Sequence, residues 1–135
     1  MDDNSVIIRN CLEKARRSLT SASDSINNND IDNAINRIYY SIFYSAMALG
    51  YKHGFVTSKH GQLIGWFNKF FIHENRIFPE KMFQVYKTAF DNRQENDYNI
   101  VVLDSIAKDE ARRTLIDAED FVNRVSGYLS EYTGQ

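Results

Sequence analysis

The sequence predicts an all-α protein of four to five helices, and three features of the 135-residue chain support this prediction. Only one Pro and six Gly interrupt the chain, which leaves long stretches free to be helical. The 43% hydrophobic and 25% charged residues are the balance of a globular protein. Apolar residues recur at amphipathic-helix spacing almost throughout. The length suits one core, so we expect residues 1–135 to form a single domain.

The first two predicted helices are separated by a polar loop. The first runs over about residues 5–26 and ends in the Asn run 27–29. The second starts after Asp30, a side chain suited to cap a helix N-terminus, and continues until Gly50 and Gly54 break it. The apolar stripe of the first helix is Ile8, Cys11, Leu12, Ala15, Leu19, Ala22 and Ile26. That of the second is Ile31, Ala34, Ile35, Ile38, Ile42, Ala46 and Leu49.

The second half of the chain contains the remaining predicted helices. A third is expected from about Ser58, a candidate cap, to residue 72. Pro79 suits the first turn of the fourth, because its missing N–H would be unpaired there, and this helix should fade near Arg93. Residues 94–107 mix polar with apolar side chains and are predicted to form an ordered loop. The last helix, about residues 108–132, should pack lengthwise on another, because its stripe has nearly heptad spacing: Ala111, Leu115, Ala118, Val122, Val125 and Leu129.

Charge and cysteine content narrow the classes of function. The formal net charge of -2 provides no global basic field, so a nucleic acid would have to meet a local patch. The single cysteine, Cys11, excludes an intramolecular disulfide and is expected in the core. The N-terminus lacks a secretory signal, and no stretch approaches the roughly 20 apolar residues of a membrane span. We therefore expect a cytoplasmic protein with no membrane contact.

One face of the second helix is aromatic and cationic. Arg37, Tyr40 and Tyr44 follow each other at i, i+3 and i+7. One interpretation is that Tyr39, Tyr40, Phe43 and Tyr44 complete the core with hydroxyl groups at its rim. The other is a contact surface for protein or RNA, because rings and guanidinium groups stack on such partners. The sequence leaves both open.

Several motifs together resemble prokaryotic HEPN-domain proteins. Residues 36–49, NRIYYSIFYSAMAL, look like the "RxYYxxFhaaxALL" helix of that family. Residues 58–61, SKHG, resemble its "sKHxg" helix start, and the aromatic residues 67–71 resemble its "F..fv" continuation. RQENDY at 93–98 matches its "RxxxDY" element, and AEDFV at 118–122 resembles "A.eFv". The resemblance covers about residues 5 to 130, and the shared order is more specific than any one motif.

This resemblance implies an up-and-down bundle, a homodimer, and a minimal nucleotidyltransferase as antitoxin partner. Active members of the wider superfamily are endoribonucleases that need no metal or cofactor and carry an Arg-x4-6-His motif. The chemistry explains the motif. Cleavage of RNA through its 2'-hydroxyl needs an acid-base group of near-neutral pKa and a cation for the developing phosphorane charge, and His with Arg supplies both.

The sequence departs from that motif after Arg93, where the next six residues contain no histidine. The functional interpretation makes Arg93 a phosphate ligand, Asp97 an acid-base or orienting group, and Tyr98 a tyrosine open to modification. Asp97 would be a weak base at its ordinary pKa of about 3.9. The structural interpretation is an Arg93–Asp97 ion pair that ties the helix end to its loop, with Tyr98 filling the gap.

The histidines are the remaining candidates. His60 follows Lys59 at a predicted helix start, where it would either join a phosphate site with the helix N-terminus or serve only in capping and packing. His53 and His73 stand alone and are expected on the surface. The spacing of His60 and His73, without clustered carboxylates, indicates no metal site.

Two functions of different classes follow. The first is a HEPN toxin or RNA-targeting component of a HEPN/nucleotidyltransferase toxin-antitoxin or defence system, with Arg93, Asp97 and Tyr98 as catalytic residues. Its residues for RNA or nucleotide binding are Lys59, His60, Arg37, Tyr40 and Tyr44. The second is a catalytically silent, dimeric HEPN module that binds a nucleotide or a protein partner. P-loop, dinucleotide-binding, zinc-protease and hydrolase-elbow motifs do not occur in the sequence.

Overall fold

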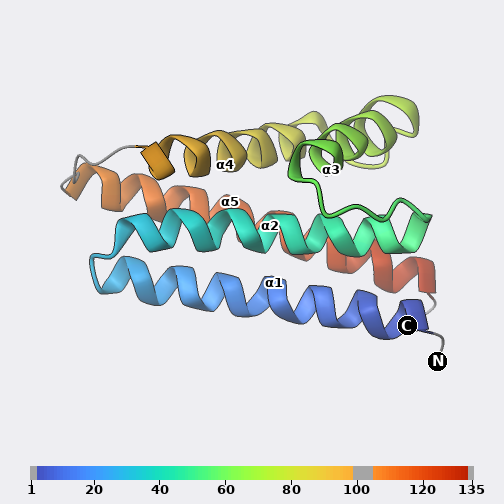
Figure 1. The fold of residues 1–135 in the computed structure, drawn as a ribbon, viewed down its shortest axis with the longest axis horizontal. Helices are drawn as coiled ribbons and strands as arrows, with labels where there is room; N and C mark the ends of the chain where they lie inside the picture. Colours follow the sequence, from blue (N-terminus) through green and yellow to red (C-terminus); the bar gives the residue numbers. More distant parts are fainter. Residues whose placement is uncertain (1–2, 99–104, 134–135) are drawn as a thin grey trace.

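The computed structural model describes residues 3–98 and 105–133, with side chains described for residues 4–95 and 108–130. Its five α-helices and one π-helical segment confirm the all-α prediction (Figure 1). They are α1 (Asp3–Asn27), α2 (Ile31–His53), α3 (His60–Phe67), η1 (Asn68–Glu74), α4 (Glu80–Tyr98) and α5 (Ser105–Thr133).

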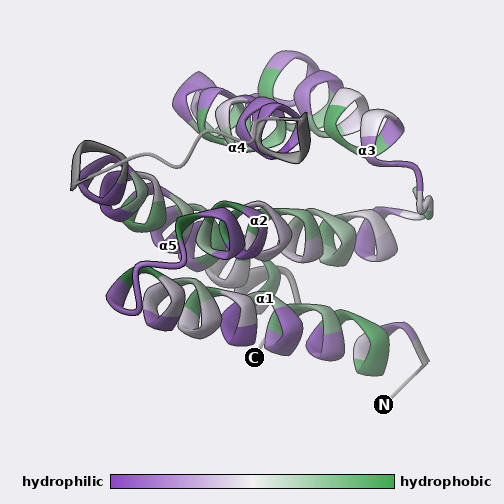
Figure 2. Cartoon of the chain, turned by 60° about the vertical axis from the view of Figure 1, so that its left-hand side comes forward, coloured by the Kyte–Doolittle hydropathy of each residue, from purple (hydrophilic) through white to green (hydrophobic). Residues whose placement is uncertain are grey.

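The long helices form an up-and-down bundle. α1 packs extensively along α2, α5 packs against both, and α4 lies on α2 and α5. Successive long helices run in opposite directions, so the start of α1 and the end of α5 lie at the same end of the bundle (Figure 1). Hydrophobic and hydrophilic residues alternate around each helix, as amphipathic helices require (Figure 2).

The core confirms the predicted apolar stripes. The six α5 residues of the near-heptad stripe are all buried, and so is Cys11, whose pKa burial raises. Large rings fill the space between the helices, and the most deeply buried are Tyr39, Phe67, Phe71, Tyr86 and Phe121.

No described helix combines the length and the apolar character that crossing a membrane requires.

Both ends of α2 are formed by residues that the sequence singled out. The Asp30 side chain accepts a hydrogen bond from the Asn33 backbone N–H at 3.3 Å, which confirms the predicted cap. Gly54 ends the helix at φ 78°, a left-handed conformation that glycine adopts without strain. The predicted break at Gly50 is wrong, because α2 continues to His53. Gly50 is buried against the Phe55 carbonyl, which leaves no room for a side chain at this position.

We expect Gly50→Ala to destabilise the protein by about 1–3 kcal/mol, because the new methyl group would overlap the Phe55 backbone. Gly65→Ala is the matched control. A Cβ at Gly65 meets nothing, so the gain in helix propensity should stabilise α3 by about 0.5–1 kcal/mol. Urea unfolding of the two variants measures both changes. Equal effects would show that the approach of Phe55 to Gly50 is not rigid.

The third helix differs from its prediction in two ways. Ser58 is not the cap: α3 begins at His60, and the hydroxyl of Thr57 accepts the Lys59 backbone N–H at 3.1 Å. Beyond Phe67 the helix widens into the π-helical segment η1, which ends where Asn75 N–H donates to the Phe70 carbonyl at 3.1 Å.

The predicted end of α4 is also wrong. The helix passes Arg93 and continues to Tyr98, because Gln94 and Glu95 are good helix formers and no Gly or Pro interrupts them. α5 begins at Ser105 and so takes up the other end of the predicted loop. Residues 99–104, with most of the loop's apolar run, lie outside the described part of the chain.

Candidate functional site

Three helices bring a tyrosine, a histidine and an arginine together. Tyr39 lies on α2, His60 is the first residue of α3, and Arg93 lies near the end of α4. The Tyr39 hydroxyl is 2.6 Å from His60 Nδ1. The Arg93 guanidinium carbon lies 5.2 Å from the Tyr39 ring centroid and 5.4 Å from that of Tyr40. Tyr39 therefore joins the histidine to the arginine.

Two residues of α2, Tyr39 and Phe43, hold the His60 ring in place. Tyr39 and Phe43 are one turn apart and both buried. The His60 ring stacks on Phe43, with centroids 4.1 Å apart and planes 13° apart. With Nδ1 held by Tyr39, the ring has a fixed orientation. His60 Nε2 is then the nitrogen left for other contacts.

Burial and charge set the protonation of this cluster. Burial lowers the pKa of His60 below its ordinary value, and the charge of Arg93 lowers it further. Burial raises the pKa of Tyr39, against an opposing effect of Arg93, so its phenol is neutral at physiological pH. His60 is consequently in its neutral form near pH 7, as a general base must be.

Arg93 lies against aromatic faces. Its Nε is buried and has no hydrogen-bond partner among the described residues. None of the ion pairs between described side chains includes Arg93. Since no described carboxylate pairs with Arg93, its terminal N–H groups are candidates for binding an anion such as phosphate.

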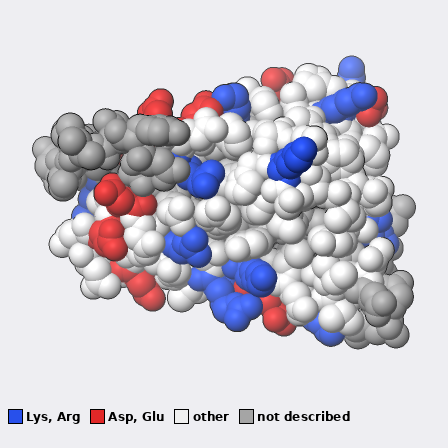
Figure 3. All heavy atoms as spheres, viewed as in Figure 1, with Lys and Arg blue, Asp and Glu red and all other residues white. Residues whose placement is uncertain are grey.

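A chain of cations and rings continues from this cluster across α2 to α1. The Arg37 guanidinium lies 5.1 Å from the Tyr40 ring centroid. The Tyr40 and Tyr44 centroids are 5.7 Å apart, and Lys14 Nζ lies 5.6 Å from the Tyr44 centroid. Figure 3 shows several Lys and Arg side chains over α1 and α2 on the face of the molecule that it draws.

The family of the chain follows from comparison with known proteins. The model of the HEPN domain matches residues 8–128. The chain belongs to the HEPN family. This confirms the resemblance seen in the motifs and agrees with the helical bundle.

Relatives of this HEPN chain come from an archaeon and a bacterium. A protein of Methanocaldococcus jannaschii named "Putative toxin" is 34% identical over 87% of this chain and 78% of its own length. A second protein of that organism, also named as a putative toxin, is 30% identical over 92% of this chain and 90% of its own length. A "UPF0332 protein" of Thermotoga maritima is 27% identical over 97% of both.

The HEPN bundle unites some of the predicted site residues and not others. His60 of α3, Arg93 of α4 and Arg37 of α2 all contact the ring of Tyr40. Lys59 is exposed, and its side chain makes no hydrogen bond, ion pair or ring contact with other described residues. Asp97 and Tyr98 are the last two residues of α4, but their side chains lie outside the described part, as does the predicted Arg93–Asp97 ion pair.

The aromatic face of α2 is buried at some positions and partly exposed at others, and its role as a contact surface stays a prediction. Tyr39 and Phe43 are core residues, whereas Tyr40 and Tyr44 are half-buried at its edge. His53 corrects another expectation, because it is not an isolated surface residue: its Nε2 lies 2.8 Å from the Tyr128 hydroxyl, and its ring packs on Phe70. The reason is that α2 continues beyond Gly50 and carries His53 over η1.

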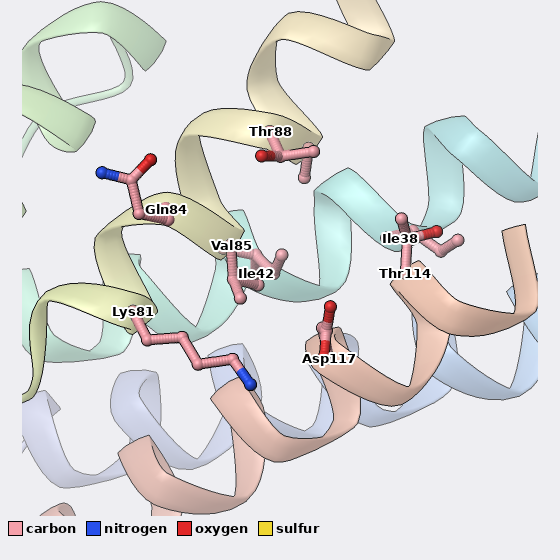
Figure 4. Close-up of a pocket in the computed structure, with 9 residues that line it drawn as sticks. Ile38, Ile42, Lys81, Gln84, Val85, Thr88, Thr114 and Asp117 are labelled. Carbon is pink, nitrogen blue, oxygen red and sulfur yellow. The ribbon is translucent and has the colours of Figure 1, made fainter. Parts of the chain in front are cut away.

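A groove of about 200 Å³ lies elsewhere on the HEPN bundle, between α4 and α5 (Figure 4). Its floor is the apolar surface of Ile38 and Ile42 on α2, and Lys81 and Asp117 stand on opposite walls. None of the predicted site residues lines it. The groove therefore does not belong to the Arg93 cluster.

Sequence reasoning missed the role of Tyr39 and the distance in sequence between the two halves of the site. The family motif places the histidine within a few residues after Arg93, whereas His60 comes from α3, earlier in the chain. The signals for His60 were its place beside Lys59 at a helix start and the SKHG motif. No spacing rule connects positions 39, 60 and 93.

Proposed function

We propose that this HEPN protein is a metal-independent endoribonuclease of the toxin type, in which Arg93 binds the scissile phosphate and His60 is the acid-base group. The observation that carries the proposal is the position of Tyr39, whose hydroxyl holds His60 Nδ1 while the Arg93 guanidinium lies over its ring. The cluster combines a neutral imidazole with a cation that has no ion-pair partner among the described side chains. These are the groups that cleavage through the 2'-hydroxyl requires.

In the proposed reaction, His60 first accepts a proton from the RNA and later returns it to the leaving group. With Nδ1–H donating to the Tyr39 oxygen, His60 Nε2 accepts the proton of the RNA 2'-hydroxyl. The 2'-oxygen attacks phosphorus and the bond to the 5'-oxygen breaks, while Arg93 stabilises the negative charge on the phosphorane oxygens. The imidazolium then returns the proton to the leaving 5'-oxygen. The products are a 2',3'-cyclic phosphate and a 5'-hydroxyl.

The cellular role that we propose is that of a toxin held in check by a partner. Two relatives are named for a toxin role, and each aligns with most of this chain. A homodimer would bring two such clusters to one RNA, and a minimal nucleotidyltransferase would act as the antitoxin. Asp97 and Tyr98 remain proposed site residues at the end of the same helix as Arg93, and Lys59 remains a proposed contact for phosphate at the start of α3.

A second candidate function rests on the packing of the same histidine. The His60 ring stacks on Phe43 and its Nδ1 contacts the Tyr39 hydroxyl, so His60 packs α3 against α2. This packing alone would account for a histidine at this position. In that case the protein is a catalytically silent, dimeric binding module for a nucleotide or a protein partner. The two candidates differ in whether RNA is cleaved.

The decisive experiment incubates the full chain with total cellular RNA in EDTA and determines the chemistry of the new RNA ends. We expect cyclic phosphate and 5'-hydroxyl ends, and about a hundredfold slower cleavage by Arg93→Ala, because the phosphorane charge loses its cation. Arg113→Ala, an exposed arginine on α5, is the matched control and should cleave at the wild-type rate. Intact mass must show that the wild type is unmodified.

Two results would contradict the proposal. Equal cleavage by the wild type and Arg93→Ala would indicate a contaminating nuclease. No cleavage by an unmodified wild-type protein, with or without a nucleotidyltransferase partner present, would favour the silent binding module.

A further inference from the structure

We propose that the strip formed by Lys14, Arg37, Tyr40 and Tyr44 is a binding track that leads single-stranded RNA to the Arg93–His60 site. The strip joins the site through Tyr40, which the guanidinium of Arg93 contacts from α4 and that of Arg37 from α2 itself. This inference rests on the proposed function, because it takes RNA as the ligand of the site.

The cations of the strip form no ion pair with the carboxylates whose side chains the structure describes. Among the described side chains, the ion pairs join Lys87, Arg112, Arg113 and Arg124 to carboxylates on their own helices. Lys14, Arg37 and Arg93 take part in none of them. Arg37 instead donates two hydrogen bonds to the neutral Asn36 side chain, at 3.1 and 2.6 Å. Three neighbouring cations that make no ion pair with a described carboxylate are suited to a polyanion, even in a chain with net charge -2.

The rings supply the second half of the recognition. Tyr40 and Tyr44 are one helical turn apart on α2, and both are half-buried with an exposed part. A base can stack on an exposed tyrosine ring or on an arginine that already lies against one, whatever the base identity. Duplex RNA keeps its bases stacked inside and offers no face to these rings. Alternating rings and cations therefore favour a single strand over a duplex.

The geometry gives the track a direction. Lys14 on α1 lies at Tyr44, Arg37 lies at Tyr40, and Arg93 lies between Tyr40 and Tyr39. The contacts thus proceed from α1 across α2 to the bond between Tyr39 and His60. A strand bound along them would present one of its phosphates to Arg93.

The test measures binding to RNA that cannot be cleaved. A fluorescent oligouridine of about 12 nucleotides, 2'-O-methylated throughout, is titrated with the full chain in EDTA and compared with a duplex of the same length. We expect the single strand to bind more tightly. Tyr44→Ala should weaken binding of the single strand by about fivefold or more, because the ring that stacks on a base is lost. Tyr44→Phe keeps the ring and should bind like the wild type.

Charge is tested by a separate pair of exposed lysines. Lys14→Gln should reduce the slope of log affinity against log salt by about 0.7, the value for one phosphate contact to a single strand. Lys69→Gln, on η1, makes the same change of charge away from the strip and should leave the slope unchanged. Thermal melting of each variant shows whether it is folded.

The outcomes separate this inference from the proposed function. If Tyr44→Ala and Lys14→Gln bind as the wild type does, the track is wrong even where Arg93→Ala abolishes cleavage. If binding depends on both residues but unmodified RNA stays intact, the track stands and the nuclease proposal fails. If both variants instead convert a dimer into a monomer by light scattering and leave RNA affinity unchanged, the strip is a contact between two copies and the inference is overturned.

Discussion

Replacing His60 with Gln should lower the rate of RNA cleavage by about 10²–10⁴-fold, because an amide neither accepts nor returns a proton. The wild-type kcat/KM should rise with pH through an apparent pKa below 6.5. This direction follows from burial and the charge of Arg93, both of which lower the pKa of His60 and so favour its neutral, basic form. Activity is then lost as pH falls through that lowered pKa. The glutamine variant should show no such limb.

The control for this prediction is His73→Gln, which removes an exposed histidine from η1 and should leave both the rate and the pH profile unchanged. Tyr39→Phe keeps the ring beneath Arg93 but removes the hydroxyl that holds Nδ1. It should shift the acid limb as well as lower the rate, whereas a purely structural tyrosine would leave the limb in place. A His60→Gln enzyme with the wild-type rate would remove His60 from the mechanism.

Phe67→Ala should destabilise the fold by about 3–5 kcal/mol, a loss comparable to the whole stability of a marginal domain. Phe67 is fully buried at the junction of α3 and η1. Its ring lies 5.5 Å from that of Tyr86 on α4 and 5.3 Å from that of Phe121 on α5, between centroids. Truncation leaves a cavity where three helices meet, so the surrounding rings can collapse only in part.

Urea unfolding followed by circular dichroism measures this change in the free energy of unfolding. The comparison is Ile116→Ala on α5. The Ile116 side chain is 65% exposed, so this change should alter stability by less than about 0.5 kcal/mol. Phe67→Leu should recover a large part of the loss, because it restores most of the buried apolar volume. A loss below about 1 kcal/mol for the alanine variant would mean that the junction repacks freely.

The helices could be predicted because helix formation depends on neighbours in sequence. Asp30 and Gly54 mark the two ends of α2, and the stripe from Ala111 to Leu129 faces the core, because capping and amphipathic spacing act within one or two turns. The end of α4 was wrong because the local helix preference of Gln94 and Glu95 was given too little weight, whereas other errors arose where tertiary contacts matter. Gly50 lies inside α2 with the Phe55 carbonyl packed against it, and α3 continues into η1, which buries Phe71.

The sequence by itself determined the residue types of the candidate site, the HEPN motifs, and the order of the helices that carry them. Arg93 and His60 were both candidates, but they are far apart in the chain and belong to different motifs. Only the tertiary structure decided that Tyr39 joins them, because packing of α3 and α4 on α2 places the two side chains on one ring. Contacts between helices depend on how whole apolar faces fit together, and no spacing along the sequence encodes that fit.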